Sequence, residues 1–313
     1  MLLQINAKAA YIIGIDLDRG GAQSLLIDLN GKVIDTLSVT YRSKEPKEFI
    51  REAVQYSYDH FLKVYHTQVI AVGIGISGIV DQRNSKIIES RLLKIHSLDV
   101  SSLFKDFPVP VAIENDANSC AGIEIFHRTY EDPFENAIFV LPRIITHEDQ
   151  TLQSVELGGA VVVNGDIWYG SRFVTGEFSI QSWFTSPVEK VRFAEEDLKL
   201  ILSSDRKLKE FIKTVLIKLI PAARMLDPDR IILGSIFAKR FDLVTEVLKD
   251  SLSSSWYDEA DHALRIRAAE EHEQSIALGA GIYILKNLYG MPHVGDSLSG
   301  LSLSWGQILK IRG

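Results

Sequence analysis

Three groups of polar residues in this chain have types and spacings that could do chemistry. The first is the segment Gly14–Gly21 (GIDLDRGG), in which an apolar run ends at Asp16 and a glycine-rich turn follows. A carboxylate at the end of a strand can position Mg²⁺, and the N–H groups of a glycine turn can bind phosphate. Glycine turns are common, so an ordinary hairpin is the alternative interpretation of this segment.

The second group is Glu114–Asn118 (ENDAN), which ends another apolar stretch. A carboxylate flanked by amides can bind neighbouring hydroxyl groups and, as a general base, deprotonate one of them. The alternative is a polar cap at the start of a helix. The third group is Gly170–Ser179 (GSRFVTGEFS), where Glu177 follows a flexible turn. A single Glu in such a place can equally be a solvated surface residue.

Alternating strands and helices must position these groups. Tyr11–Asp16 is an apolar run, and Asn30-Gly31 joins two β-rich stretches in a pattern typical of a tight hairpin. The period changes over Pro46–Tyr65, which predicts an amphipathic helix. Its predicted buried face consists of Phe49, Ile50, Ala53, Val54, Ser57, Phe61 and Leu62.

The second half of the chain follows the same plan. Strand-like stretches precede an Asn164-Gly165 hairpin, and a helix is predicted from about Lys207 to Leu226, bent or interrupted at Pro221. A strand (RIILGS) and a late helix (SIALGAGIYILKNLY) follow. A strand, an Asn-Gly hairpin and then helices in each half are typical of a duplicated, two-lobed α/β fold.

Composition excludes several classes of protein. The 313 residues are 46% hydrophobic and 24% charged, close to an ordinary globular protein. No apolar run approaches the about 20 residues that cross a bilayer, and a single cysteine, Cys120, excludes an internal disulfide. The net charge of −7 argues against direct binding to a phosphate backbone. We expect a cytoplasmic protein without a membrane segment.

The order and spacing of the motifs are more specific than any one of them. GIGISGIVD, IENDANSCAGIE, GGAVVVNGDIWYGSRFVTGEF, LDPDRIILGS and ALGAGIYIL occur in this order. Over nearly the whole chain, they resemble the ROK family of repressors, open reading frames and sugar kinases. The resemblance implies an actin-like ATPase (ribonuclease H-like) fold with a sugar in a cleft between two lobes. It places Asp116 at the position of the kinase base, and it makes Asn115, Asp116 and Glu177 sugar ligands.

The phosphate-binding elements depart from the kinase pattern. Kinases of the family begin with Asp-x-Gly-Gly-Thr, whereas Leu17, Asp18, Arg19 and Gly20 follow Asp16 here. A Gly-Thr-Gly turn is expected before Gly158 and Gly159, but this chain has Glu156 there, and Ser235 replaces a second glycine. Extra carboxylates would repel a polyphosphate. We therefore expect no ATP binding and no catalysis.

The family's metal site is also altered. ROK proteins often carry x-Gly-His after the Gly-Glu pair and then three cysteines that hold zinc. Here Ile180 stands at the histidine position and the cysteine cluster is missing. We expect neither a metal nor another cofactor.

These departures favour a regulator. The opening residues (LLQINAKAAYIIGIDLDRGG) resemble the junction between the DNA-binding part and the sugar lobe of ROK repressors of the xylose or N-acetylglucosamine type. No helix-turn-helix fits before the first strand, so we expect contact with DNA only through a domain absent from this chain. The family also implies a homodimer. The alternatives are a degenerate or active sugar kinase and a sugar-sensing scaffold that never touches DNA.

The resemblance also suggests domain boundaries. We expect a smaller N-terminal lobe over residues 1–117, a larger lobe over 118–290 and a tail over 291–313, with the late helix returning to the first lobe.

Overall fold

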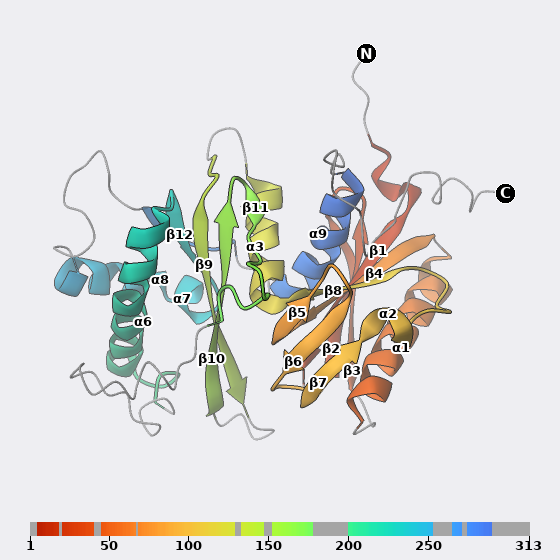
Figure 1. Ribbon diagram of the computed structural model, residues 1–313, viewed down its shortest axis with the longest axis horizontal. Coiled ribbons are helices and arrows are strands. Elements are labelled where there is room, and N and C mark those ends of the chain that lie inside the picture. The colour runs from red at the N-terminus through yellow and green to blue at the C-terminus, as the bar shows by residue number, and fades with distance from the viewer. Residues whose placement is uncertain are drawn as a thin grey trace, which may run out of the picture. The chain divides into compact units, whose positions relative to one another are not determined.

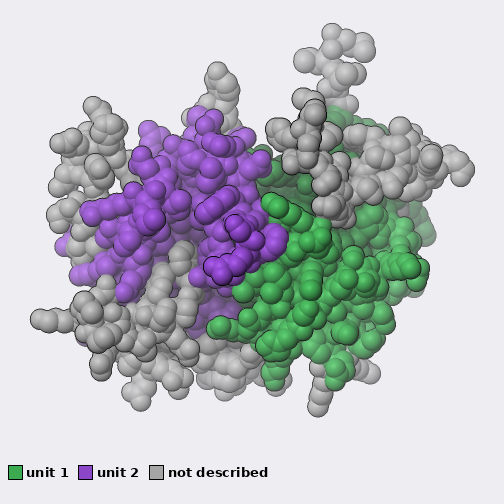
Figure 2. Space-filling view, in the orientation of Figure 1, with its two compact units in different colours: residues 1–127, 272–313 green, residues 128–271 purple. Residues whose placement is uncertain are grey.

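The computed structural model describes most of the chain, and its residues form two compact units. The described ranges are 5–18, 21–40, 45–66, 68–128, 133–146, 152–177, 200–252, 265–270 and 274–289. Unit 1 comprises residues 1–127 and 272–313, and unit 2 comprises residues 128–271 (Figure 2). None of the described helices is long and apolar enough to cross a membrane.

The sheet of unit 1 has the strand order β3-β2-β1-β4-β8 (Figure 1). Its strands are β1 (Tyr11–Asp18), β2 (Gly21–Asp28), β3 (Val33–Thr40), β4 (Val69–Ile76) and β8 (Val111–Asn115). Strand β2 is antiparallel to β1 and β3, whereas β1, β4 and β8 are parallel. The predicted Asn30-Gly31 hairpin joins β2 to β3, and the Asp28 carboxylate accepts hydrogen bonds from Asn30 N and Lys32 N, both at 2.9 Å.

A short helical turn, η1 (Ala7–Ala9), precedes β1, and three of the described helices of unit 1 have 12 or more residues. They are α1 (Pro46–Tyr65), α3 (Asp116–His127) and α9 (Ser275–Tyr289). The predicted periodicity of α1 is confirmed, because its buried residues are Phe49, Ile50, Ala53, Val54, Ser57 and Phe61. Leu62 is only partly buried.

Helix α9 lies directly on β1 and β4, because glycines let the backbones approach. A Cβ atom on Gly14 would lie 2.0 Å from the carbonyl oxygen of Ala277, and one on Gly73 would lie 2.2 Å from that of Ala280. Side chains at these positions would push the helix off the sheet. Helix α9 thus belongs to unit 1, as the sequence suggested. Helix α3 also belongs to unit 1, which ends at residue 127 and resumes at 272, whereas the sequence placed the lobe boundary at 117.

Between β4 and β8, unit 1 also contains a small antiparallel sheet. Its strands are β5 (Ile79–Asp81), β6 (Lys86–Ser90) and β7 (Ile95–Asp99), and α2 (Val100–Leu103) follows.

The sheet of unit 2 repeats the plan of the first, with the order β11-β10-β9-β12-β13. Its strands are β9 (Ala137–Thr146), β10 (Leu152–Val163), β11 (Asp166–Ile167), β12 (Arg230–Leu233) and β13 (Arg265–Ala268). In chain order, both sheets read third, second, first, fourth, fifth strand, and the first, fourth and fifth are parallel. The Asn164-Gly165 hairpin is confirmed, and both residues have the positive φ, 53° and 76°, that a two-residue turn needs.

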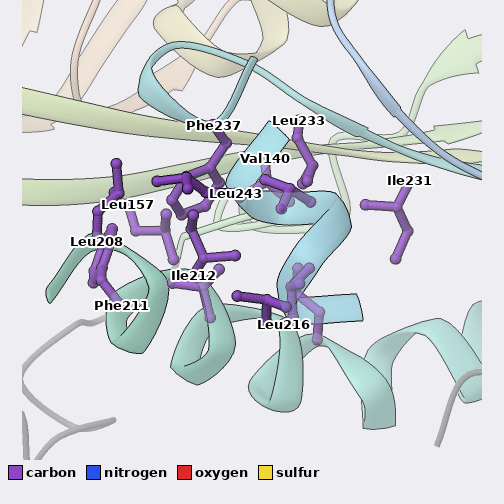
Figure 3. Packing of buried hydrophobic residues seen from close by; sticks show 14 of the residues in the cluster. Val140, Leu157, Leu208, Phe211, Ile212, Leu216, Ile231, Leu233, Phe237 and Leu243 are labelled. Atoms are coloured by element: carbon purple, nitrogen blue, oxygen red, sulfur yellow. The ribbon is translucent and has the colours of Figure 1, made fainter. Parts of the chain in front are cut away.

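Unit 2 has its own hydrophobic core, formed by its sheet and helices. The helices are α6 (Asp205–Leu226), α7 (Ile236–Lys239) and α8 (Phe241–Val247), followed by η2 (Leu248–Leu252). Phe211, Ile212 and Leu216 of α6 pack with Val140, Ile231 and Phe237 (Figure 3). Helix α6 continues through Pro221, so of the bend or interruption that the sequence suggested there, the interruption does not occur.

Candidate functional site

The polar motifs of unit 1 meet at one edge of its sheet. Strands β1, β4 and β8 are parallel, so their carboxyl ends lie at the same edge, where α/β sheets bind ligands. Asp16 of β1 pairs in register with Gly75 of β4, which pairs with Glu114 of β8. The sheet therefore brings Asp16 together with the segment that contains Asn115 and Asp116.

Asn115 is the last residue of β8, and both ends of its amide are hydrogen-bonded. Its Oδ1 accepts from the backbone N of Asn118 at 3.1 Å, and its Nδ2 donates to the carbonyl oxygen of Gly78 at 2.9 Å. The bond to Asn118 is the one that a helix-capping side chain makes. Asn115 is therefore a cap of α3, the alternative that the sequence left open. Its amide still has a second N–H that a ligand hydroxyl could use.

Asp116 begins α3 and is 5% exposed. Its Oδ1 accepts a hydrogen bond from the backbone N of Ala117 at 2.8 Å. A carboxylate has about four lone-pair sites on its two oxygens, so it can accept several hydrogen bonds at once. The position suits either role considered from the sequence, a sugar ligand or a base.

Glu177 belongs to unit 2, whereas Asn115 and Asp116 belong to unit 1. It is exposed, and its backbone N donates to the carbonyl oxygen of Val174 at 3.2 Å. Gly176 beside it has φ of +82°, and a Cβ there would lie 1.9 Å from the carbonyl oxygen of Gly159. The turn before Glu177 is thus packed directly on β10 at Gly159.

Glu156 lies within β10, which corrects the expectation of a phosphate-binding turn at this point. The strand continues from Leu152 to Val163, and Gly158 and Gly159 also lie within it. Glu156 pairs in register with Arg143 of β9. Opposite charges at facing positions stabilise a strand pair by about 0.2–1 kcal/mol, and the β-branched residues around them favour a strand over a turn. The expected acid is present, but it is part of the sheet.

At the first hairpin, Asp16 is half-buried near the end of β1, and Asp18 is exposed and pairs in register with Gly21 of β2. Gly20 lies outside the described residues, so the phosphate-loop expectation can be followed only up to Asp18.

Ser235 follows β12 with φ of 54° and ψ of −134°. An L-residue rarely adopts this conformation, whereas glycine adopts it readily. The backbone there has the conformation of a glycine turn, although the residue is serine.

The sequence predicts no metal site, partly because Ile180 stands at the position of a family histidine. Ile180 is not among the described residues. Within the described ranges, no three His, Cys, Asp or Glu side chains are grouped so that they could hold a metal ion. Cys120 is buried in α3.

Two further residues support this site, Glu114 and Gly78, and neither was expected from the sequence to have a role of its own. Glu114 is 2% exposed and accepts hydrogen bonds from the motif that follows it. Gly78 has φ of +132° and accepts the bond from Asn115. The sequence could have indicated both residues, because Glu114 lies within the motif IENDANSCAGIE and Gly78 within the motif GIGISGIVD.

Comparison with known proteins gives a consistent result. A sequence profile described as "ROK family" matches residues 12–179. The xylose repressor of Bacillus spizizenii is 31% identical over 131 residues, which are 40% of this chain and 34% of that protein. The chain spans less than half the length of its curated relatives, at 42%, 34% and 44% of the first three.

Solved structures share the fold. A ROK family transcriptional regulator, a homolog of the E. coli MLC protein, superposes with a TM-score of 0.69 at 14% identity, over 91% of this chain and 79% of that one. A ROK family glucokinase from Streptomyces griseus, in complex with glucose and AMPPNP, superposes with a TM-score of 0.62 at 17% identity, over 87% and 98%. The expected actin-like α/β fold is confirmed by these likenesses.

Proposed function

Because the chain belongs to the ROK family, we propose that it is the sugar-sensing domain of a cytoplasmic ROK-type transcriptional regulator, without catalysis and without zinc. Relatives named xylose repressors support the regulator class. The ligand is a sugar or sugar derivative that Asn115, Asp116 and Glu177 bind. Contact with DNA is made through a further domain beyond these 313 residues.

The observation that carries this proposal is a contrast between the residues at the sugar-binding positions and those at the phosphate-binding positions of the family's kinases. Asn115 and Asp116 match the family's sugar motif, and both side chains are hydrogen-bonded at the end of β8 and the start of α3. The phosphate elements carry Asp18 at one hairpin, Glu156 within a strand and Ser235 at a glycine turn. Phosphoryl transfer relies on positioning and charge neutralisation around the phosphates, so it is sensitive to added acids. Binding of a sugar hydroxyl requires only the sugar-binding residues.

The test is calorimetric titration with xylose, glucose and N-acetylglucosamine. We expect one of them to bind, and Asp116→Asn should weaken that sugar by about 1.5–3 kcal/mol, the contribution of a hydrogen bond to a charged group. Asp106→Ala, which removes an exposed acid of unit 1, is the matched control and should leave the affinity unchanged. An affinity that is the same in wild type and Asp116→Asn would contradict the assigned site.

A sugar kinase is the second candidate function, favoured by the position of Asp116 and by the likeness to the glucokinase. We expect no ATP binding in the presence of Mg²⁺ and no phosphorylation of any of the three sugars. Micromolar ATP affinity, or phosphorylation of one of these sugars, would favour the kinase function over the regulator function.

We also propose a homodimer, because closed two-fold assemblies are the commonest in soluble proteins and would present two DNA-binding arms to a palindromic operator. Sedimentation at micromolar concentration should give a species of twice the 35.1 kDa chain mass. A 35.1 kDa species alone would contradict the dimer.

A further inference from the structure

Glu114 is a buried acid inside the proposed sugar motif, and it is not one of the proposed sugar ligands. It is 2% exposed at the end of β8. Its Oε1 accepts a hydrogen bond from the backbone N of Asn115 at 2.7 Å and another from Nδ2 of Asn118 at 3.2 Å. A buried carboxylate is unfavourable unless hydrogen bonds compensate for the lost water. Both of these bonds come from the two asparagines that flank Asp116.

These bonds connect to a longer chain of hydrogen bonds. Asn118, held by Glu114, donates its backbone N to Oδ1 of Asn115 at 3.1 Å. The other end of the Asn115 amide donates to Gly78 at 2.9 Å. With its oxygen and its nitrogen each bonded, the Asn115 amide cannot flip without breaking both bonds. Asp116, between the two asparagines, is held by the same segment.

The side chain of Glu114 is buried in closely packed surroundings. Gly75 pairs in register with Glu114, and the side chain of Ile276 packs against it. A Cβ atom on Gly75 would lie only 2.5 Å from Cγ2 of Ile276. Burial first, and then the negative charge of Glu114, raise the pKa of Tyr283 on α9 far above its ordinary value. Hydrogen bonds are stronger in such surroundings, and an unpaired group there costs more.

We propose that Glu114 is the positioning residue of the sugar site: its carboxylate fixes Asn115 and Asn118, so that Asn115 and Asp116 meet the ligand in a single orientation. This inference rests on the proposed sugar site. It assigns Glu114 no contact with the sugar.

The test compares Glu114→Gln with Glu114→Ala. The Gln side chain has the same shape and keeps an oxygen that can accept both hydrogen bonds, whereas Ala leaves Asn115 N and Asn118 Nδ2 without this acceptor. We expect Glu114→Ala to weaken sugar binding about tenfold or more, and Glu114→Gln to stay within about threefold of wild type. Asn118→Ala should resemble Glu114→Ala, and the double variant should be no weaker than the worse single variant, because both remove one network.

The control must separate positioning from loss of stability. Ser57→Ala removes a buried hydroxyl pair with Ser24 (2.7 Å) elsewhere in unit 1, so it should lower the melting temperature without changing sugar affinity. All affinities are measured at a temperature where each variant is fully folded. Equal affinities for Glu114→Ala and wild type would overturn the proposal, and so would equal losses in Glu114→Ala and Ser57→Ala.

Amide hydrogen exchange without sugar tests the same inference independently. Exchange of the peptide that spans residues 114–118 should accelerate in Glu114→Ala and remain as in wild type in Glu114→Gln. Unchanged exchange in Glu114→Ala would overturn the positioning role. If wild type binds none of the sugars, the proposed function fails while this measurement still decides whether Glu114 fixes the motif.

Discussion

At the scale of single residues, Ser235 is a serine in a backbone conformation that is typical of glycine. Its φ of 54° and ψ of −134° cost an L-residue about 1–3 kcal/mol, and glycine adopts them without that strain. Ser235→Gly should therefore raise the free energy of unfolding by about 1 kcal/mol, after the greater flexibility of glycine in the unfolded chain is subtracted. Urea unfolding would measure the change.

Ser235→Ala is the matched control, because alanine keeps the strain and only loses the hydroxyl. It should have nearly the stability of wild type. If the Gly and Ala variants are equally stable, the backbone at this position is not strained in solution.

At the scale of elements, glycines decide how closely two helices pack. Gly279 of α9 lies against α3, and a Cβ there would lie 2.0 Å from the carbonyl oxygen of Ser119. Gly122 of α3 has no atom within 4 Å of where its Cβ would be. Gly279→Ala should thus destabilise the protein by about 1–3 kcal/mol through overpacking, whereas Gly122→Ala should stabilise it by up to about 1 kcal/mol through helix propensity.

Thermal unfolding of the two variants checks this pair. Because both replace a helical glycine by alanine, a difference in sign between them isolates the helix contact. A melting temperature that rises in both would mean that α9 can move away from α3 at little cost.

The same elements show what a sequence can predict. The buried face of α1 and the two Asn-Gly hairpins were predicted correctly, because periodicity and turn chemistry are local. Strands β5, β6 and β7 are three to five residues long and were not predicted, since so few residues give no clear period. Glu156 was assigned to a turn, but it lies within β10 and pairs with Arg143 of the preceding strand, β9. The network of Glu114 also depends on contacts that only the fold makes, such as the one between Asn115 and Gly78.

At the scale of the whole molecule, each compact unit has a core of its own. Leu216 of α6 belongs to a cluster built only from residues of unit 2, and Leu285 of α9 belongs to one built only from residues of unit 1. Both side chains are fully buried. Separate cores allow the units to unfold in separate steps.

Calorimetric unfolding should therefore show two transitions that respond to different substitutions. Leu216→Ala should lower the transition of unit 2, and Leu285→Ala that of unit 1, each by about 2–5 kcal/mol of unfolding free energy. A single transition that both variants lower would mean that the units unfold together. If Asp116 of unit 1 binds the sugar as proposed, sugar should raise the transition of unit 1, by up to about 2.7 kcal/mol at a concentration a hundredfold above Kd. If sugar raises only the transition that Leu216→Ala lowers, Asp116 is not the sugar ligand.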